Sequence, residues 1–277
     1  MDTRYLPNDQ AYPRMNTEEL RSNFLVENLF IAGEITLLYA DADRAIVGSA
    51  VPTKGVLELQ GSIQEMATEI FAERRELGVI NIGGQGSVSV DEGTYEMEKG
   101  DALYVGRGSR QISFSSNDEK HPAEFYLLSY PAHANYPTKL IKNAAGEVED
   151  LGSAEAANTR RIVKLIHPGS VQSCQLVMGI TSLGHGQVWN TMPPHLHPRR
   201  MEVYMYFDLD PSERVFHLMG KPDEIRTLVM KTKQAVISPS WSMHSAAGTR
   251  NYTFIWGMGG ENQAFTDMDF INMDTLR

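Results

Sequence analysis

The stretch ELGVINIGGQGSVSVDEGTYEMEKGDALYVGRGS, residues 76–109, decides the fold class. It consists of short runs in which apolar residues alternate with polar ones, separated by Gly, Asp and Asn. Alternation at period two puts the apolar side chains on one face of a strand, and turn residues at intervals of roughly ten positions are typical of β-sandwiches and barrels. Similar runs occupy residues 33–52 and 110–132. The sequence therefore predicts an all-β protein.

A second set of such runs follows a polar, alanine-rich joint at residues 142–159. We therefore predict two β-barrel domains, 1–145 and 146–277, with a few short helices. The clearest helix is expected over residues 15–31, where Asn16 or Thr17 can cap the N-terminus. Residues 102–111 can be laid over residues 235–244, with Gln111 at the position of His244. If this weak repeat is real, the first half keeps the scaffold and lacks the ligand.

Composition and charge narrow the class of function. The chain has 277 residues, 42% of them hydrophobic, and a net charge of −10. That charge argues against nucleic acid and anionic membranes as partners, because binding to either needs a basic surface. The single cysteine, Cys174, permits no internal disulfide and is expected to be a buried small side chain. With no secretory signal or membrane-spanning run visible, we expect a cytoplasmic protein.

The stretch MPPHLHPRRMEVYMYF, residues 192–207, carries the candidate chemistry. Two prolines favour an extended chain, in which His195 and His197 point to the same face. Glu202 follows after a turn, at the head of a strand, and His244 follows another proline-containing turn. Nitrogen and oxygen ligands of this kind suit a divalent transition metal such as zinc, manganese, iron, cobalt or nickel. The alternative is a set of separate surface histidines, with Glu202 paired to a neighbouring arginine.

These residues resemble a known family. The H-x-H-x4-E cluster, followed about forty residues later by a histidine after a turn, resembles the cupin metal motif, and EKGDALYVGRGS resembles a cupin half that has lost its metal. More narrowly, the chain is similar to the 5-keto-4-deoxyuronate isomerase family. Four segments carry that similarity: residues 4–25, 43–52, 73–84 and 193–207.

The resemblance implies two cupin-type (double-stranded β-helix, jelly-roll) barrels, the first degenerate and without metal ligands. It implies one Zn²⁺ per chain, held by His195, His197, Glu202 and His244, and a homohexamer. It also implies conversion of 5-dehydro-4-deoxy-D-glucuronate to 3-deoxy-D-glycero-2,5-hexodiulosonate in the breakdown of pectin or other uronate polymers. A divalent metal suits this aldose–ketose isomerisation because it stabilises the enediolate.

The substrate of such a reaction also needs a cation for its carboxylate and a group that moves a proton. The arginine candidates are Arg160, Arg161, Arg199 and Arg200, any of which can instead be solvated or paired with an acid. The candidates for proton transfer are His185, Tyr204 and Tyr206, besides a metal-bound hydroxide. His185 can equally be a plain turn residue, and the two tyrosines can equally be core residues.

Three other functions remain open at this stage. The first is another cupin sugar isomerase, of the 5-deoxy-glucuronate isomerase type, which differs in substrate. The second is a cupin dioxygenase, which would need a redox-active metal. The third is a non-catalytic sugar-binding cupin, although no helix-turn-helix pattern or basic segment supports a transcription factor.

Overall fold

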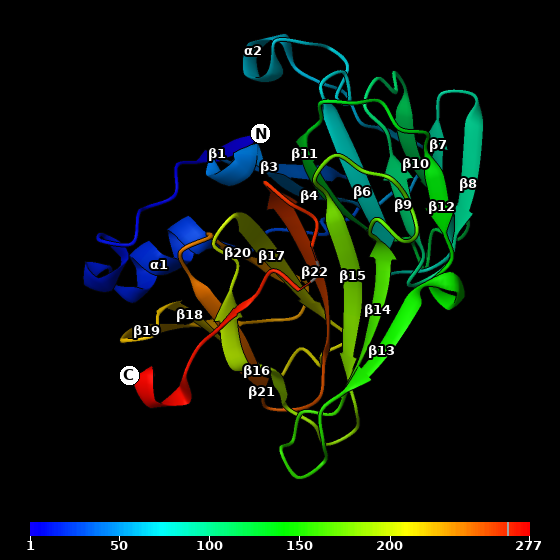
Figure 1. Cartoon of the computed structure of the whole chain (residues 1–277). Helices are drawn as coiled ribbons and strands as arrows, with labels where there is room; N and C mark the ends of the chain where they lie inside the picture. Colours follow the sequence, from blue (N-terminus) through cyan, green and yellow to red (C-terminus); the bar gives the residue numbers. More distant parts are fainter. Residues whose placement is uncertain (265) are drawn as a thin grey trace. The chain divides into compact units, whose positions relative to one another are not determined.

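The computed structural model describes residues 1–264 and 266–277. They form two compact units, each built from two β-sheets (Figure 1). Unit 1 comprises residues 1–4, 28–147 and 164–178, and unit 2 comprises residues 5–27, 148–163 and 179–277. Each unit thus combines segments that are separate in the sequence. The two predicted domains, 1–145 and 146–277, differ from these units chiefly at residues 5–27 and 164–178 and stay a prediction.

Unit 1 pairs a seven-stranded sheet with a four-stranded one. In order across the larger sheet, the strands are β1 (Asp2–Arg4), β3 (Ile35–Ala40), β4 (Ile46–Ala50), β11 (Phe125–Pro131), β6 (Arg75–Asn81), β9 (Ala102–Val105) and β12 (Lys139–Ile141). The smaller sheet runs β5 (Leu57–Glu58), β10 (Ile112–Ser116), β7 (Gly86–Val90) and β8 (Gly93–Met97).

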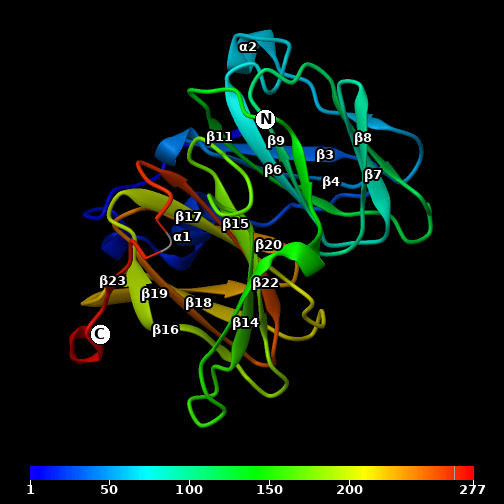
Figure 2. The same ribbon diagram turned by 45° about the vertical axis from the view of Figure 1, so that its right-hand side comes forward.

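Unit 2 follows the same plan. Its larger sheet runs β13 (Glu147–Leu151), β14 (Arg160–Ile166), β15 (Val177–Leu183), β22 (Thr253–Gly260), β17 (Arg200–Phe207), β20 (Gln234–Ser238) and β2 (Leu25–Val26). Its smaller sheet runs β19 (Glu224–Met230), β18 (Val215–Lys221), β21 (Met243–Gly248), β16 (Trp189–Leu196) and β23 (Asp269–Phe270). Figure 2 shows β16, β18 and β19 together, with the red C-terminal segment beside them.

Helices are few and short. The helices are α1 (Thr17–Phe24) and α2 (Ile63–Met66), with single 3-10 turns at Tyr12–Arg14, Ala42–Arg44, Asn143–Ala145 and Met273–Thr275. Asn16 and Glu19 form a reciprocal capping box at the start of α1, so Asn16 is the cap. The helix expected over residues 15–31 is wrong beyond Phe24, because Leu25 and Val26 pair with Val236 and Ala235 of β20. No helix among the described residues is long and apolar enough to cross a membrane.

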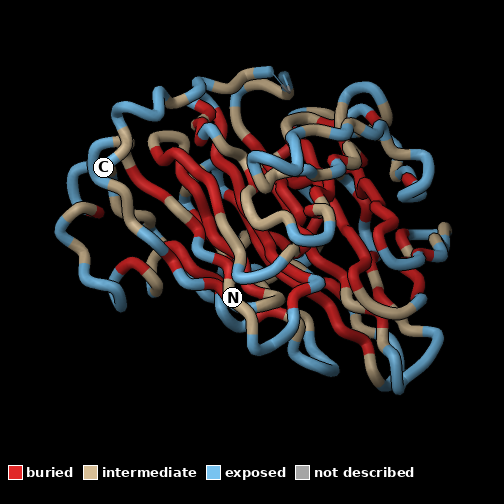
Figure 3. The backbone as a smooth tube through the Cα atoms, turned by 90° about the horizontal axis from the view of Figure 1, so that it is seen from below, coloured by how far each residue is buried: buried red, intermediate tan, exposed pale blue. Residues whose placement is uncertain are grey.

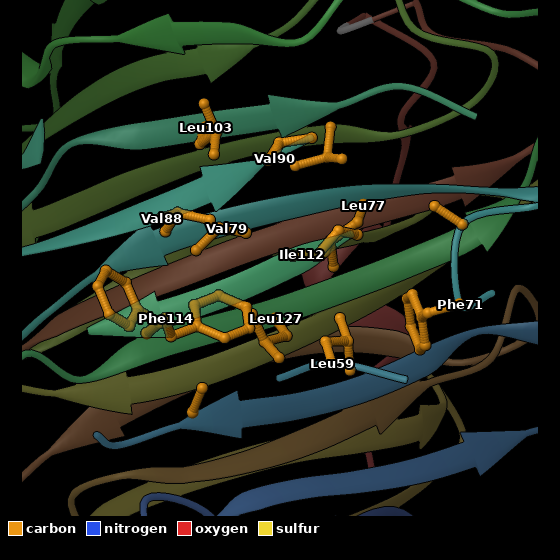
Figure 4. Packing of buried hydrophobic residues seen from close by; sticks show 14 of the residues in the cluster. Leu59, Phe71, Leu77, Val79, Val88, Val90, Leu103, Ile112, Phe114 and Leu127 are labelled. Carbon is orange, nitrogen blue, oxygen red and sulfur yellow. The ribbon is translucent and has the colours of Figure 1, made fainter. Parts of the chain in front are cut away.

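Burial follows the strand pattern that the sequence predicts. Buried positions lie along the strands of both units, and exposed positions gather in the loops (Figure 3). The core of unit 1 is a cluster of aliphatic and aromatic side chains that includes Leu59, Leu77 and Phe114 (Figure 4). The fold is therefore all-β, as expected.

The strand registers of the two units correspond residue by residue. Leu57 faces Phe114 in unit 1 as His195 faces His244 in unit 2. Leu77 faces the last residue of β9, as Glu202 faces the last residue of β20. The internal repeat is thus present in the fold.

By this register the positions of the four candidate ligands hold apolar residues in unit 1. Leu57 and Leu77 stand for His195 and Glu202, Phe114 stands for His244, and Leu59, two residues after Leu57, stands for His197. The expected equivalence of Gln111 with His244 is wrong. The connection after β9 is longer than the one after β20, and this shifts the equivalent position to Phe114. Unit 1 therefore packs a hydrophobic core where unit 2 gathers polar groups.

Candidate metal centre

Three strands of unit 2 bring the four candidate ligands together. β16 carries His195 near its end, and His197 follows directly after its last residue. A register irregularity between Asn190 and His195 re-aims the strand. The ring centroids of His195 lie 4.9 Å from His197 and 4.6 Å from His244. Glu202, near the start of β17, places its Oε2 atom 3.3 Å from Nε2 of His197 and 3.0 Å from Nε2 of His244. The four residues thus lie together, as their spacing in the sequence predicts.

The four ligand atoms are buried and lack hydrogen-bond partners. These atoms are His195 Nδ1, His197 Nε2, Glu202 Oε2 and His244 Nε2. One ligand atom from each residue lies within 4.8 Å of all the others. An unpaired buried polar atom costs about 1–3 kcal/mol, so four of them at one point indicate that another group belongs there. Ligands about 2.0–2.1 Å from a tetrahedral ion lie roughly 3.3 Å apart, which matches the observed spacing of Glu202 from the histidines.

The protonation states also fit a metal. Burial lowers the pKa of His195 to about 2, and burial likewise lowers the pKa of His244, so both imidazoles are neutral. Burial alone would raise the pKa of the Glu202 carboxyl, but its interactions with His244 and His197 outweigh burial and hold that pKa below its ordinary value. Neutral imidazoles beside an ionised carboxylate are the forms that bind a divalent cation.

Residues behind the ligands fix how the imidazole rings point. Nδ1 of His197 donates to the backbone carbonyl of Asp267, and Nδ1 of His244 lies 3.2 Å from the hydroxyl of Ser238. With Nδ1 occupied, the Nε2 lone pair of each ring faces the centre. Arg200, which is fully buried, donates to the carbonyls of Ala264 at 2.8 Å and Asp267 at 3.3 Å and so holds the segment that orients His197.

A cavity of about 220 Å³ opens onto this cluster. His195, His197 and Glu202 form part of its wall, together with Arg160, Thr191 and Tyr204. The rest of the wall is mostly apolar and comprises Leu151, Ile162, Thr181, Met192, Pro193, Phe254, Trp256, Met258, Met268 and Phe270. A small organic molecule with one anionic group fits a site of this kind, because it combines a buried ligand cluster with a single cation.

Comparisons with known proteins assign the chain to a family. The model of the KduI/IolB family matches residues 26–273. The chain is 51% identical over its whole length to the 4-deoxy-L-threo-5-hexosulose-uronate ketol-isomerase of Shouchella clausii, and 49% identical to that of Caldicellulosiruptor bescii, covering 100% of both relatives. The chain belongs to the KduI/IolB family.

Solved structures agree on the fold. An IolB-like protein from Salmonella typhimurium superposes with a TM-score of 0.73 at 14% identity, covering 90% of this chain and 97% of that one. Oxalate decarboxylase from Bacillus subtilis superposes with a TM-score of 0.60 at 12% identity, covering 90% and 79%. The resemblance to a ketol-isomerase family with a cupin-type fold is therefore confirmed.

In this KduI/IolB chain, only one of the four arginine candidates lines the cavity. Arg160 does so, half-buried on β14, with Nη1 donating to the carbonyl of Asn158 at 3.0 Å. Arg161 and Arg199 lie on the surface. Arg161 forms a bidentate salt bridge with Asp150, and Arg199 forms one with Glu261. Arg200 donates to the carbonyls of Ala264 and Asp267 and so holds the segment that orients His197. Arg160 is thus the one arginine of the four that is placed to bind a ligand in the cavity, whereas the other three contact other groups of the protein.

The candidates for proton transfer also separate. His185 is exposed in a turn and does not line the cavity. Tyr204 lines it, next to Glu202, and burial and the charge of Glu202 raise the pKa of Tyr204 well above its ordinary value. Tyr206 lies outside the cavity wall, with its hydroxyl 2.8 Å from Nδ1 of His217. Tyr204 is therefore the one candidate of the three that a ligand in the cavity can touch.

Sequence reasoning missed the contribution of the C-terminal segment. β23 pairs with β16 opposite His195 and Leu196, and Met268 and Phe270 form part of the cavity wall. The Asp267 carbonyl, in the same segment, orients His197. Nothing in the residue types of this short segment indicates a role, because its contribution comes from a backbone carbonyl and from two apolar side chains.

Proposed function

We propose that this chain is a ketol-isomerase that converts 5-dehydro-4-deoxy-D-glucuronate to 3-deoxy-D-glycero-2,5-hexodiulosonate. The relatives bear the name of a ketol-isomerase at about 50% identity along the full chain. The observation that carries the proposal is structural. Four unpaired buried ligand atoms converge at one point, and three of their residues line a cavity in which Arg160 is the only arginine among the described residues. The substrate has a carbonyl at one end and a carboxylate at the other. The carbonyl can lie at the ligand cluster while the carboxylate lies at the arginine.

The metal would be held by His195, His197, Glu202 and His244. We propose zinc, one per chain, because three imidazoles and one carboxylate form a donor set that zinc favours. When bound, a divalent ion supplies Lewis-acid stabilisation of the negative charge that develops on the substrate oxygens.

Arg160 would bind the substrate carboxylate. Burial lowers the pKa of Arg160, but a guanidinium stays charged at neutral pH, and its planar fork matches a carboxylate. The apolar wall strengthens this contact by excluding water. The carboxylate at Arg160 then directs the aldehyde end of the six-carbon chain toward the histidine cluster.

Tyr204 would supply a proton to the reacting oxygen. Isomerisation removes a hydrogen from the carbon beside the aldehyde and adds one to the aldehyde carbon, while a proton moves between the two oxygens. The hydroxyl of Tyr204 lies at the cavity wall beside Glu202, and its raised pKa keeps it protonated at neutral pH. It can therefore donate its proton to the carbonyl oxygen and recover one from the neighbouring hydroxyl.

Isomerase activity and metal content together test the proposal. Purified protein should convert the unsaturated-uronate breakdown product without nucleotide or oxygen and should contain about one zinc per chain. His244→Ala should lose most of both metal and activity, whereas His185→Ala, in an exposed turn, should keep both. A metal-free wild type with full activity would contradict the metal centre. Strict dependence on oxygen would favour a dioxygenase instead.

We also propose a homohexamer that works in the cytoplasm on products of pectin or related uronate polymers. The resemblance to the family supports these three points. Light scattering after size-exclusion chromatography measures the oligomer: a mass near six chains is expected, and a monomer would contradict it.

A further inference from the structure

The strap, residues 268–277, contributes one part of the cavity wall. Met268 and Phe270 of this segment line the cavity. The ring centroid of Phe270 lies 5.8 Å from that of His195, yet 66% of Phe270 is exposed to solvent. Phe270 therefore lies at the mouth of the cavity, between the histidine cluster and the solvent.

The strap is attached to unit 2 mainly through its backbone. β23 pairs with β16 over two residues, at the edge of the sheet. The amide of Ile271 donates to the Pro194 carbonyl at 2.9 Å, and the amide of Arg277 donates to the Pro222 carbonyl at 2.8 Å. Residues 266–277, all of them described, include no buried residue. A segment that buries so little side chain opens locally at a lower free energy than the whole domain unfolds.

Asp267, directly before the strap, is fixed through both its side chain and its backbone. Its Oδ2 atom lies 3.5 Å from Nε of the buried Arg200 and accepts from Nδ2 of Asn262 at 2.5 Å. Its carbonyl accepts from Nη2 of Arg200 at 3.3 Å and from Nδ1 of His197. The strap can therefore leave the barrel beyond Asp267 without releasing the carbonyl that orients His197.

We propose that the strap is a lid that opens from the edge of β16 to admit the substrate and then closes over it, with Asp267 as the hinge and Phe270 as the gate. The four candidate ligands are at most 6% exposed, so a ligand reaches them through the mouth that Phe270 borders. Closure excludes water from the reacting carbons. The inference rests on the proposed isomerase function for what enters the cavity, whereas the opening of the strap does not depend on that function.

A disulfide that locks the strap tests the lid directly. Leu196 and Asp269 are paired in the ladder of β16 and β23, and Cα atoms of such pairs lie about 4.5–5.5 Å apart, a separation that a disulfide spans. Their side chains point away from the face that carries His195 and Phe270. In Leu196→Cys/Asp269→Cys, oxidation should lower kcat and slow zinc removal by a chelator, each about tenfold or more, and a reductant should restore both. Oxidised Leu196→Cys alone is the matched control and should behave like its reduced form.

Two substitutions on the strap test the gate without a cross-link. Phe270→Ala removes the ring at the mouth and should speed zinc removal by the chelator about tenfold. Met273→Ala is the matched control, because Met273 is also exposed, at 49%, but lies outside the cavity wall, and it should keep the rate within about twofold of wild type. In native-state hydrogen exchange, the amides of Ile271 and Arg277 should exchange about 10²-fold faster than those of β17.

Three results would each overturn the lid. They are equal rates of zinc removal in the oxidised and reduced double variant, equal rates in Phe270→Ala and Met273→Ala, and strap amides that exchange only as slowly as those of β17. A wild type that is inactive on the uronate, but whose strap amides exchange early and whose zinc removal slows on cross-linking, would overturn the proposed function and leave the lid in place. The two failures are therefore distinguishable.

Discussion

Arg160 is the only arginine that the described residues contribute to the cavity wall, and its replacement by methionine should weaken binding of the substrate carboxylate. Among the described residues its one side-chain hydrogen bond runs from Nη1 to the Asn158 carbonyl, so Nε and Nη2 are available for a carboxylate. Two hydrogen bonds between charged groups contribute about 1.5–3 kcal/mol each. Discounting for partial exposure, we expect a loss of about 3 kcal/mol, which lowers kcat/KM roughly 10²-fold.

The same chain supplies matched controls for this prediction. Arg161 and Arg199 are exposed and pair with Asp150 and Glu261, and exposed pairs of this kind contribute about 0–1 kcal/mol to stability. Arg161→Met and Arg199→Met should therefore keep kcat/KM within about twofold of wild type. The assay is steady-state conversion of the uronate with zinc content measured in parallel. A kcat/KM for Arg160→Met within threefold of wild type, at full zinc content, would refute the assignment.

Three further predictions follow from buried groups. Glu76→Gln should lower the free energy of unfolding by about 3 kcal/mol in urea titration, because the buried Glu76 carboxylate accepts three backbone N–H groups and one tyrosine hydroxyl; an unchanged midpoint would contradict this. Arg200→Met should weaken zinc binding about 10–100-fold in a chelator competition, because Arg200 holds the segment that orients His197; wild-type affinity would exclude that role. Burial lowers the pKa of His217 to about 3, so the unfolded chain binds the proton first as pH falls. The contribution of His217 to the free energy of unfolding is therefore full above about pH 6.5 and is lost as the pH falls toward 3, by about 2 kcal/mol between pH 7 and pH 5. Urea titrations at pH 7 and pH 5 should show this loss in the wild type and not in His217→Gln. An equal loss in wild type and variant would contradict the prediction.

The sequence predicts the parts of this molecule that depend on local pattern. Alternating runs bounded by Gly, Asp and Asn predict the strands, because period-two burial is a property of the strand itself. The spacing of His195, His197 and Glu202 predicts their convergence for the same reason, since an extended chain and a turn determine which face each side chain takes. The equivalent positions in unit 1 are apolar, which the strand register reveals.

The features that sequence reasoning missed depend on distant partners. The expected helix ends at Phe24 because Leu25 and Val26 pair with a strand more than two hundred residues away. Choosing among the four arginines requires knowing which acids lie beside Arg161 and Arg199. His197 is oriented by the backbone carbonyl of Asp267, and a contact made by the backbone cannot be predicted from the type of side chain at that position.

Reversible removal of the metal tests the central claim most directly. The holoenzyme is treated with a chelator, assayed on the uronate, and assayed again after stepwise addition of Zn²⁺. We predict that activity disappears on removal of the metal and returns in proportion to zinc, saturating at one ion per chain, while His244→Ala recovers none. Full activity in the metal-free protein, or recovery in His244→Ala equal to that of wild type, would contradict a metal centre built from His195, His197, Glu202 and His244.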